Sequence, residues 1–381
     1  MKIGIIAPND LRIYDGTTVR ITGLTKHISK YLSEVLLVSK TINRELMGIR
    51  NIRHIKISHL RALTLLLINY LHIIPHQNFD VLLTERLLLR RRIRSKIDII
   101  HAHWILSLPI ALALRRGLFN DANIIVDLHG LFELQEVKGD LIGKILHNFF
   151  KFIERIEVYD KAISAFVVPS QALKEYIVKR FEIPRSKVYV IPDGINAADV
   201  PFYSEKRVSG VRKVLKFDSR PVIGYVGLPD FYHGIYDLLT AFKIVKKKYE
   251  DCLLLLIVPS TSLMQSILRR YDVKENDVRL LENIPRYKLF NYLLAVDVSV
   301  IPHRANTQFD FLPSNKILDY MATGKPIVAY SLRPIVDMLK DYPLKVLAQP
   351  NNPNELAEGL ITALKNYSCL LYTSPSPRDR G

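Results

Sequence analysis

Cysteine is scarce in this chain, which has only Cys252 and Cys369 among its 381 residues. No disulfide framework or cysteine metal site can be argued from two cysteines, and a reducing cytoplasm fits this usage. Long hydrophobic runs are missing as well. The longest, from Ala62 to Pro75, is interrupted by Asn69 and His72 and is too short to span a bilayer. We therefore expect no membrane-spanning helix.

The first residues, MKIGIIAP, lack the long apolar core and the small-residue cleavage site of a signal peptide. They read as a first strand instead. A hydrophobic content of 49% with 24% charged residues is typical of a folded globular protein and not of a disordered chain. A length of 381 residues is enough for two domains of ordinary size. The composition predicts a folded, cytoplasmic, two-domain protein.

The last residues, 369–381, follow no hydrophobic periodicity and resemble a translated sequencing-library adaptor. We expect the fold to end near Ser368 and treat 369–381 as an artefactual tail. A natural flexible tail is the alternative interpretation.

Positive charge is unevenly distributed, and the net charge is +17. Residues 44–96 hold 11 basic and 3 acidic side chains beside several leucines. This mixture suits a helix lying in an anionic lipid headgroup layer, so a peripheral position on the inner face of a membrane is one prediction. A solvated basic face over core leucines is the other. No nucleic acid partner is expected, because aromatic residues are not interleaved with the basic run.

Strand and helix patterns alternate twice along the chain. Seven apolar runs before residue 192 and six after residue 221 fit parallel strands that are covered on both faces. Between them, residues 197–218 lose periodicity and carry Pro201 and Gly210, as an interdomain linker would. The fold class is therefore α/β, with two Rossmann-like doubly wound domains over 1–196 and 219–368. Ligands bind such sheets at the carboxyl ends of the strands, which predicts a site in a central cleft between the domains.

The segment from Leu312 to Ala329, LPSNKILDYMATGKPIVA, carries the strongest motif. It predicts a loop, a short helix, a Gly-Lys-Pro turn and a buried strand. A helix N-terminus presents free backbone N–H groups that suit an anion. Asp319 lies one helical turn further on, where its carboxylate can accept hydrogen bonds from sugar hydroxyls. Together these features predict a site for the diphosphate and ribose of a nucleotide.

This segment resembles the donor-binding motif of the large retaining glycosyltransferase family GT4, which has the GT-B fold and reads roughly P-x-K-x-x-E-Y-M-A-x-G-K-P-V-V-A. The resemblance implies transfer of a sugar from a UDP- or GDP-linked nucleotide sugar, with retention of configuration, to a lipid-linked or polysaccharide acceptor. The acceptor would bind the N-terminal domain and the donor the C-terminal domain. No cofactor is expected, because the nucleotide sugar is a substrate. A nucleotide-sugar epimerase of the same fold, or a non-catalytic basic binding protein, remains an alternative.

In the first half, four segments resemble family motifs. Gly16 opens the first helix and permits close backbone approach to a donor. His101 and His103 alternate on one strand face; a metal pair is conceivable, but no third ligand has obvious spacing, so no metal is expected. His129 follows the next strand. The resemblance places it at the active site, where it would contact a sugar hydroxyl or, when protonated, the leaving phosphate. Asp193 is interpreted as a turn residue.

In the second half, the stretch from Gly224 to Phe242 matches G-R-L-x-x-x-K-G-x-x-x-L-L-x-A-F in frame. The resemblance implies that Arg and Lys of this motif clamp the two phosphates of the donor. Here Leu228 and His233 stand in their places, and two fixed charges are missing. We expect phosphate binding that is weaker and more pH-sensitive, or compensation by Lys316 or Arg304; loss of activity is a further alternative.

The remaining donor-binding candidates lie near these two motifs. Asp310 is a candidate carboxylate beside the donor sugar and Asp319 the candidate for the ribose. No Asp-x-Asp metal motif occurs, so metal-independent catalysis is expected. The other candidate donor-binding residues are Gly227, Arg304, Ser314, Asn315 and Lys316.

Overall fold

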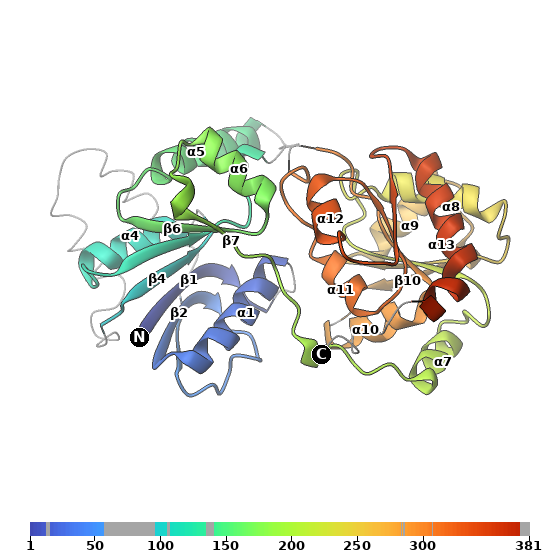
Figure 1. The fold of residues 1–381 in the computed structure, drawn as a ribbon, viewed down its shortest axis with the longest axis horizontal. Helices are drawn as coiled ribbons and strands as arrows, with labels where there is room; N and C mark the ends of the chain where they lie inside the picture. The colour runs from blue at the N-terminus through green and yellow to red at the C-terminus, as the bar shows by residue number, and fades with distance from the viewer. Residues whose placement is uncertain are drawn as a thin grey trace. The chain divides into compact units, whose positions relative to one another are not determined.

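The computed structural model describes residues 1–12, 16–56, 96–104, 107–134, 141–282, 284, 286–306 and 308–373. It divides into two compact units, Met1–Asp193 and Gly194–Gly381. Each unit holds one parallel sheet with helices on both faces (Figure 1). The expected α/β class with two Rossmann-like doubly wound domains is therefore confirmed.

The sheet of the first unit has seven parallel strands in the order β3-β2-β1-β4-β5-β6-β7. Its strand order reverses direction at β1 and β4, which is the switch point where doubly wound sheets bind ligands. The strands are β1 (Lys2–Asp10), β2 (Glu34–Thr41), β3 (Ile52–Lys56), β4 (Ile99–His103), β5 (Asn123–Asp127), β6 (Ile163–Val168) and β7 (Val188–Val190).

Four α-helices of the first unit are described, and α1 lies on the opposite side of the sheet from α5 and α6 (Figure 1). They are α1 (Gly16–Ile28), α4 (Leu108–Gly117), α5 (Leu141–Glu157) and α6 (Gln171–Arg180). On the α1 side, Ile3 and Ile5 of β1 pack with Ile21 of the helix and with Val35 and Leu37 of β2. This core brings the start of α1 to the carboxyl end of the sheet.

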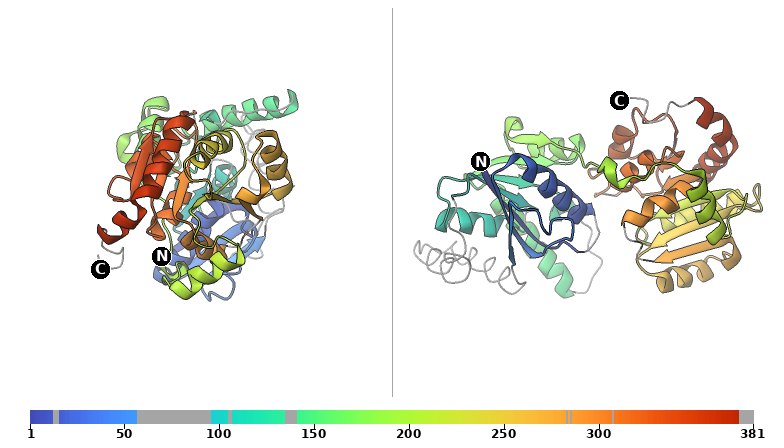
Figure 2. Two further views of the ribbon diagram at one scale, coloured as in Figure 1. Left: turned by 90° about the vertical axis from the view of Figure 1, so that its right-hand side faces the viewer. Right: turned by 90° about the horizontal axis from the view of Figure 1, so that it is seen from below.

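The sheet of the second unit has six parallel strands in the order β10-β9-β8-β11-β12-β13. Figure 2 gives two further views of the ribbon. The strands are β8 (Val222–Val226), β9 (Leu253–Val258), β10 (Val278–Glu282), β11 (Val298–Ile301), β12 (Ile327–Tyr330) and β13 (Lys345–Ala348). The helices are α7 (Glu205–Val214), α8 (Ile235–Lys246), α9 (Thr261–Arg270), α10 (Arg286–Ala295), α11 (Lys316–Ala322), α12 (Arg333–Met338) and α13 (Pro353–Thr373).

Strand β9, LLLLIV, is buried along its whole length because it faces two cores. Leu254 and Leu256 pack into the core under α8, α9 and α13, whereas Leu253, Leu255 and Ile257 pack into the core under α10, α11 and α12. Alternation of this kind explains why the strands of a covered parallel sheet read as unbroken apolar runs. The unbroken apolar runs in the sequence thus predicted that helices cover both faces of the sheet.

Gly234 precedes α8 and adopts a left-handed backbone conformation, with φ +72° and ψ 24°. A Cβ atom at this position would lie 1.6 Å from the backbone oxygen of Pro302. No side chain fits there, so this glycine allows the start of α8 to approach the end of β11.

The expected linker over 197–218 is partly wrong, because it contains helix α7. Glu205 lies in its first turn and Arg212 in its last turn, which suits the helix dipole. Nη1 of Arg212 donates to the backbone oxygen of Ala295 at 2.7 Å, and Val211 packs against the core of the second unit. The helix was missed because Gly210 interrupts its pattern. The two units divide between Asp193 and Gly194, close to the expected end of the first domain at 196.

The expected end of the fold near Ser368 is also not observed, since α13 continues to Thr373. The segment Cys369–Tyr372 contains no helix breaker, whereas Ser374 precedes Pro375, which disfavours a further turn. Positions 374–381 of the expected tail lie outside the described residues. Of the basic block 44–96, residues 57–95 also lie outside them. Among the described helices, none is long and apolar enough to cross a membrane.

Candidate functional site

The first unit carries a buried group of histidines and carboxylates at the carboxyl ends of β4 and β5. His101 and His103 alternate on one face of β4, and His103 pairs in register with Asp127, the last residue of β5. His129 follows two residues later. Nδ1 of His103 lies 3.0 Å from Nε2 of His129. Oδ2 of Asp127 lies 3.7 Å from Nε2 of His101 and 3.7 Å from Nδ1 of His103. The structure therefore assembles residues that the sequence had placed in two separate motifs.

Arg20 of α1 closes this group from the side. Its Nε lies 3.0 Å from Oδ2 of Asp127, and its Nη1 lies 2.8 Å from Oδ1 of Asp193. The side chains of Arg20 and Asp127 are 8% and 1% exposed, so this is a buried ion pair. Asp193, interpreted from the sequence as a turn residue only, thus also joins an ionic network. The sequence reasoning missed Arg20, although it lies within the motif that begins at Gly16.

Burial sets the protonation of the group. Together with the nearby Arg20 guanidinium, which contributes less, burial lowers the pKa of His101 to about 4 and that of His129 to about 3. Burial also raises the pKa of Asp127 to about 6, although Arg20 opposes this. His129 is therefore neutral at pH 7. This favours a hydrogen bond to a sugar hydroxyl over the alternative role as a protonated partner of a leaving phosphate.

Asp127 is the third possible metal ligand beside His101 and His103, and the sequence spacing did not reveal it. Ligand atoms of His101, His103 and Asp127 all lie within 4.8 Å of one another, as they would around a metal ion. However, Arg20 hydrogen-bonds both oxygens of this carboxylate. A guanidinium cation already provides the positive charge here, so the group is better explained as an ionic and imidazole network.

Gly16 is the first residue of α1 and is exposed. The preceding residues 13–15 lie outside the described residues. The glycine starts the helix that carries Arg20, which is consistent with a turn close to the sheet.

In the second unit, the candidate donor-binding residues meet beyond the carboxyl end of β8. Gly227 follows this strand, and a Cβ atom there would lie 2.8 Å from the hydroxyl of Tyr225 and 3.0 Å from Cε of Lys316. The Lys316 side chain thus lies over the Gly227 backbone. Burial lowers the pKa of Lys316, and the carboxylates of Asp319 and Asp230 oppose this. Among the described residues, no hydrogen bond or ion pair engages its amine, so it is available to an anionic ligand.

Ser314 and Asp319 flank this lysine, and both are buried. Oγ of Ser314 has no hydrogen-bond partner among the described residues. Buried hydroxyls are normally paired, so an unpaired one at this position suits a bound ligand. Asn315 is the N-cap residue of α11, and its side chain makes no capping hydrogen bond. The structure thus brings Lys316 beside Gly227, and Ser314, Asn315 and Asp319 lie within three residues of this lysine in the chain.

His233, which takes the place of the family lysine, is held by Asp230. Its Nδ1 lies 2.9 Å from both carboxylate oxygens, and its backbone N–H donates to Oδ1 at 2.8 Å. The ring also meets the buried ring of His303 edge-on, with centroids 5.1 Å apart. The sequence reasoning missed both Asp230 and His303. Asp230 was visible three residues before His233, a spacing that a tight turn closes.

Arg304 and Asp310 are placed differently from the other candidates. Arg304 is ion-paired with Asp237, whose other oxygen accepts a hydrogen bond from Tyr330 at 3.0 Å. The guanidinium also lies 4.5 Å from the centroid of the Phe231 ring. Arg304 is thus engaged within the protein. Asp310 is exposed.

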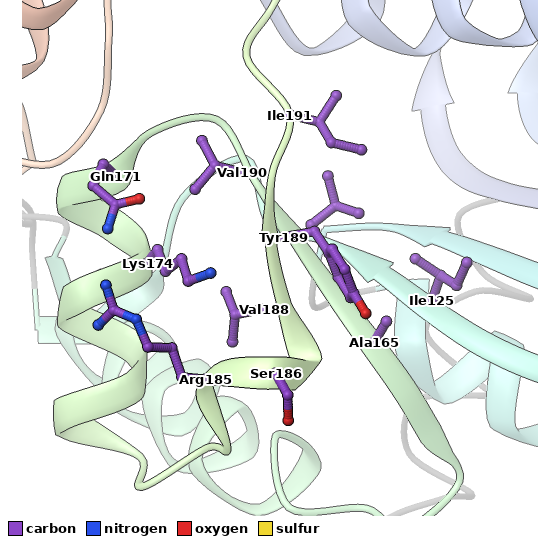
Figure 3. A pocket seen from close by; sticks show the side chains of 11 residues that line it. Ile125, Ala165, Gln171, Lys174, Arg185, Ser186, Val188, Tyr189, Val190 and Ile191 are labelled. Atoms are coloured by element: carbon purple, nitrogen blue, oxygen red, sulfur yellow. The ribbon is translucent and has the colours of Figure 1, made fainter.

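A separate pocket of about 730 Å³ lies beside β7 in the first unit (Figure 3). Apolar side chains of the sheet form its floor, and Gln171, Lys174 and Arg185 lie on one side of it. None of the candidate residues from the sequence lines it. The pocket is therefore distinct from both residue groups described above.

Two parallel doubly wound units are the building blocks of the GT-B glycosyltransferase fold, and comparison with known families identifies the family. The family profile described as Glycosyltransferase Family 4 matches residues 19–199, and that described as Glycosyl transferases group 1 matches residues 220–366. The chain belongs to this family of group 1 glycosyltransferases.

Individual relatives agree with this assignment. The chain is 23% identical over 378 residues to the uncharacterized glycosyltransferase MJ1607 of Methanocaldococcus jannaschii, covering 95% of this chain and 88% of the relative. In fold, it is similar to sucrose-phosphate synthase from Thermosynechococcus elongatus, with TM-score 0.71, 16% identity and coverage of 96% and 90%. It is also similar to Anabaena HepE in complex with UDP-glucose, with TM-score 0.68, 15% identity and coverage of 97% and 91%.

Proposed function

We propose that this glycosyltransferase moves a hexose from a UDP- or GDP-linked donor to a lipid-linked or polysaccharide acceptor with retention of configuration. The observation that carries the proposal is the site in the second unit, where the amine of Lys316 and the hydroxyl of buried Ser314 lie without partners among the described residues. A fold neighbour is described in complex with UDP-glucose, which supports a donor of this class.

The residues of the second unit suit the two ends of a nucleotide sugar. Lys316 would bind the diphosphate, because a cation stabilises phosphate charge. Asp319 would accept hydrogen bonds from the ribose. As the glycosidic bond to the diphosphate breaks, negative charge develops on the leaving phosphate, and preorganised donors there lower the barrier. The transfer needs positioning of donor and acceptor and no protein nucleophile.

His129 of the first unit would contact the transferred sugar. Because its imidazole is buried and neutral, one ring nitrogen can donate and the other accept a hydrogen bond. Nε2 lies 3.0 Å from Nδ1 of His103, which fixes the ring orientation. The basic composition of 44–96 supports an acceptor at an anionic membrane surface, in cell-envelope polysaccharide synthesis on the cytoplasmic side.

The purified protein should be incubated with a panel of UDP- and GDP-linked sugars, with Asp319→Asn as the matched inactive control. Slow release of UDP or GDP that depends on Asp319 supports transfer or its hydrolytic side reaction. Conversion to a different sugar nucleotide without release would support an epimerase instead. If neither release nor conversion is observed, although circular dichroism shows an intact fold, a non-catalytic binding protein would be supported. With an acceptor in hand, the anomeric configuration of the product by NMR tests retention.

A further inference from the structure

Helix α5 exposes a row of large apolar side chains, Leu141, Ile145 and Phe152. They are 74%, 58% and 55% exposed, and they follow one another at intervals of four and seven positions. Residues at these intervals share one face of an α-helix. Helices α7, α9 and α12 expose one large apolar side chain each, among the side chains that the structure describes. Helix α5 thus presents an apolar stripe and not a single exposed residue.

The opposite face of α5 attaches the helix to the first unit. Glu154 lies two positions after Phe152, which on a helix is the far side, and it is buried. Its Oε2 accepts a hydrogen bond from the backbone N–H of Glu133 at 3.1 Å, and Nη2 of Arg155 donates to Oε2 of Glu133 at 2.9 Å. The helix lies on the side of the sheet away from α1 (Figure 1). These contacts fix α5 with its apolar stripe turned outward.

Two lysines border the stripe on one side. Lys144 directly precedes Ile145 and Lys151 directly precedes Phe152, so the two lysines are seven positions apart and lie on one line along the helix. Lys144 is exposed and Lys151 is half-buried. Among the described residues, no hydrogen bond or ion pair engages either amine. The outward face of α5 therefore combines apolar side chains with cations that have no counterion there.

We propose that α5 docks on an anionic lipid bilayer, with its apolar stripe inserted at the boundary of the acyl chains and its two lysines at the lipid phosphates. A helix with an apolar face and bordering cations lies in the plane of the membrane interface. Lysine stems extend along apolar surface and keep their amines among the headgroups. The inference rests on the proposed function, because a lipid-linked acceptor is reached at a membrane. It assigns the contact to α5, which is separate from the basic segment 44–96.

A second copy of the chain fits this face less well. Three side chains that are already half exposed bury on the order of 100 Å² each, whereas a stable interface buries about 1,200–2,000 Å² in total. A second α5 would also bring two further lysines to a face that offers them no carboxylate. An anionic bilayer supplies both an apolar layer and negative charge, so it complements the stripe and the lysines together.

The test is flotation of the full chain with vesicles of phosphatidylcholine and phosphatidylserine. The double variant Ile145→Ser, Phe152→Ser should lower the lipid partition coefficient by about tenfold for each apolar side chain removed. The double variant Lys144→Gln, Lys151→Gln should lower it by about fivefold per lysine, and added salt should have a smaller effect on this variant than on the wild type. All four substituted side chains lie on the outward face, so circular dichroism should be unchanged.

Matched controls remove the same chemistry from the second unit. Leu263→Ser takes away an apolar side chain of α9 that is 52% exposed. The double variant Lys247→Gln, Lys248→Gln takes away two exposed lysines directly after α8, with the same change in net charge as the α5 lysine variant. Both controls should keep the wild-type partition coefficient. An equal loss in the control lysine variant would show an effect of net charge alone and would overturn the role of Lys144 and Lys151.

Fluorescence reports the contact directly, because Trp104 is the one native tryptophan of the chain. In Phe152→Trp, anionic vesicles should shift the emission to shorter wavelength, and brominated lipids should quench it. Leu263→Trp is the control and should show neither change. An unshifted, unquenched emission from Phe152→Trp in the vesicle-bound protein would overturn the inference, as would wild-type flotation of the double serine variant.

The outcomes also separate this inference from the proposed function. Release of UDP or GDP from a soluble nucleotide sugar does not require α5, so the α5 variants should keep the wild-type rate in the absence of lipid. If the wild type releases neither nucleotide but floats through α5, the proposed function is lost and the docking surface stands. If release is normal and no vesicle binds the chain, only the docking surface is lost.

Discussion

Nε of Arg20 lies 3.0 Å from Oδ2 and 3.3 Å from Oδ1 of Asp127, although 107 positions separate the two residues in the chain. This pair joins helix α1 to the end of β5, beside the candidate active-site histidine. Nη1 of the same guanidinium binds Asp193, the last residue of the first unit. One side chain therefore fixes three elements at the carboxyl edge of the first sheet.

Arg20→Met should destabilise the fold by about 3–5 kcal/mol, because it leaves Asp127 buried without a partner. Chemical denaturation measures this loss. The double variant with Asp127→Asn should recover part of it, since the uncompensated charge is then removed. Arg12→Met is the matched control: its arginine also pairs with an aspartate, Asp10, but is 67% exposed. Equal losses in both single variants would contradict the role assigned to Arg20.

Asp319→Ala and His129→Ala should each reduce turnover of a nucleotide sugar by about 10²-fold or more, because each removes a contact to the reacting substrate. Initial rates of UDP or GDP release provide the measurement. Asp341→Ala removes an exposed carboxylate from the same unit and serves as the control. Wild-type rates in both test variants would remove the site assignment.

Gly227→Ala should raise the donor KM by about tenfold or more, since small displacements in a binding site are costly. The new Cβ atom would lie 2.8 Å from the Tyr225 hydroxyl and 3.0 Å from Cε of Lys316, so both the hydroxyl and the lysine must shift. Gly210→Ala in α7 is the control, because nothing lies within 4 Å of a Cβ atom there. That change should raise stability by about 0.5–1 kcal/mol and leave KM unaltered. Unaltered KM in Gly227→Ala would argue against the placement of Lys316 in the site.

The buried imidazole of His101 predicts a pH-dependent loss of stability. Its pKa is lowered from the ordinary 6.5 to about 4 by burial, with Arg20 adding to the effect. Between these values the unfolded chain binds a proton that the folded chain does not, so stability falls as pH decreases from 6.5 to 4. Relative to the non-titrating variant His101→Leu, the wild type should lose up to about 1.4 kcal/mol per pH unit. Denaturant midpoints at several pH values measure the difference. Parallel curves would contradict it.

The basic segment 44–96 predicts binding to anionic membranes that weakens with salt. Flotation with vesicles containing phosphatidylserine should recover the protein at low salt and lose it at high salt. Neutral phosphatidylcholine vesicles are the control. Binding that is indifferent to both lipid charge and salt would end the membrane proposal.

The strands were the most predictable part of the fold. Both faces of each sheet are covered, so runs such as LLLLIV in β9 contain little except apolar residues. Helix α7 was missed because Gly210 sits within a polar, surface helix that few core contacts define. Helix α13 continues beyond Ser368 to Thr373, whereas residues 369–381 were expected to form no part of the fold. That these residues are an artefactual tail stays a prediction.

For the candidate site, local motifs were predictable and the links between them were not. The sequence singled out His129, Lys316 and Asp319 because each follows a strand or opens a helix in a recognisable motif. It gave no sign that Arg20 would reach Asp127, since long side chains meet across elements whose packing a single sequence does not specify. The central cleft between the two domains stays a prediction.

Any side chain at Gly234 would place a Cβ atom against the Pro302 carbonyl, and this affects what a glycine at the same position in a relative indicates. That collision is with main chain, so it penalises every other amino acid regardless of whether any donor is ever bound. A homologue that had abandoned sugar transfer would still retain this glycine to keep its α8 in place. The presence of this glycine in a relative therefore indicates that the start of α8 is preserved, and it does not by itself indicate sugar transfer.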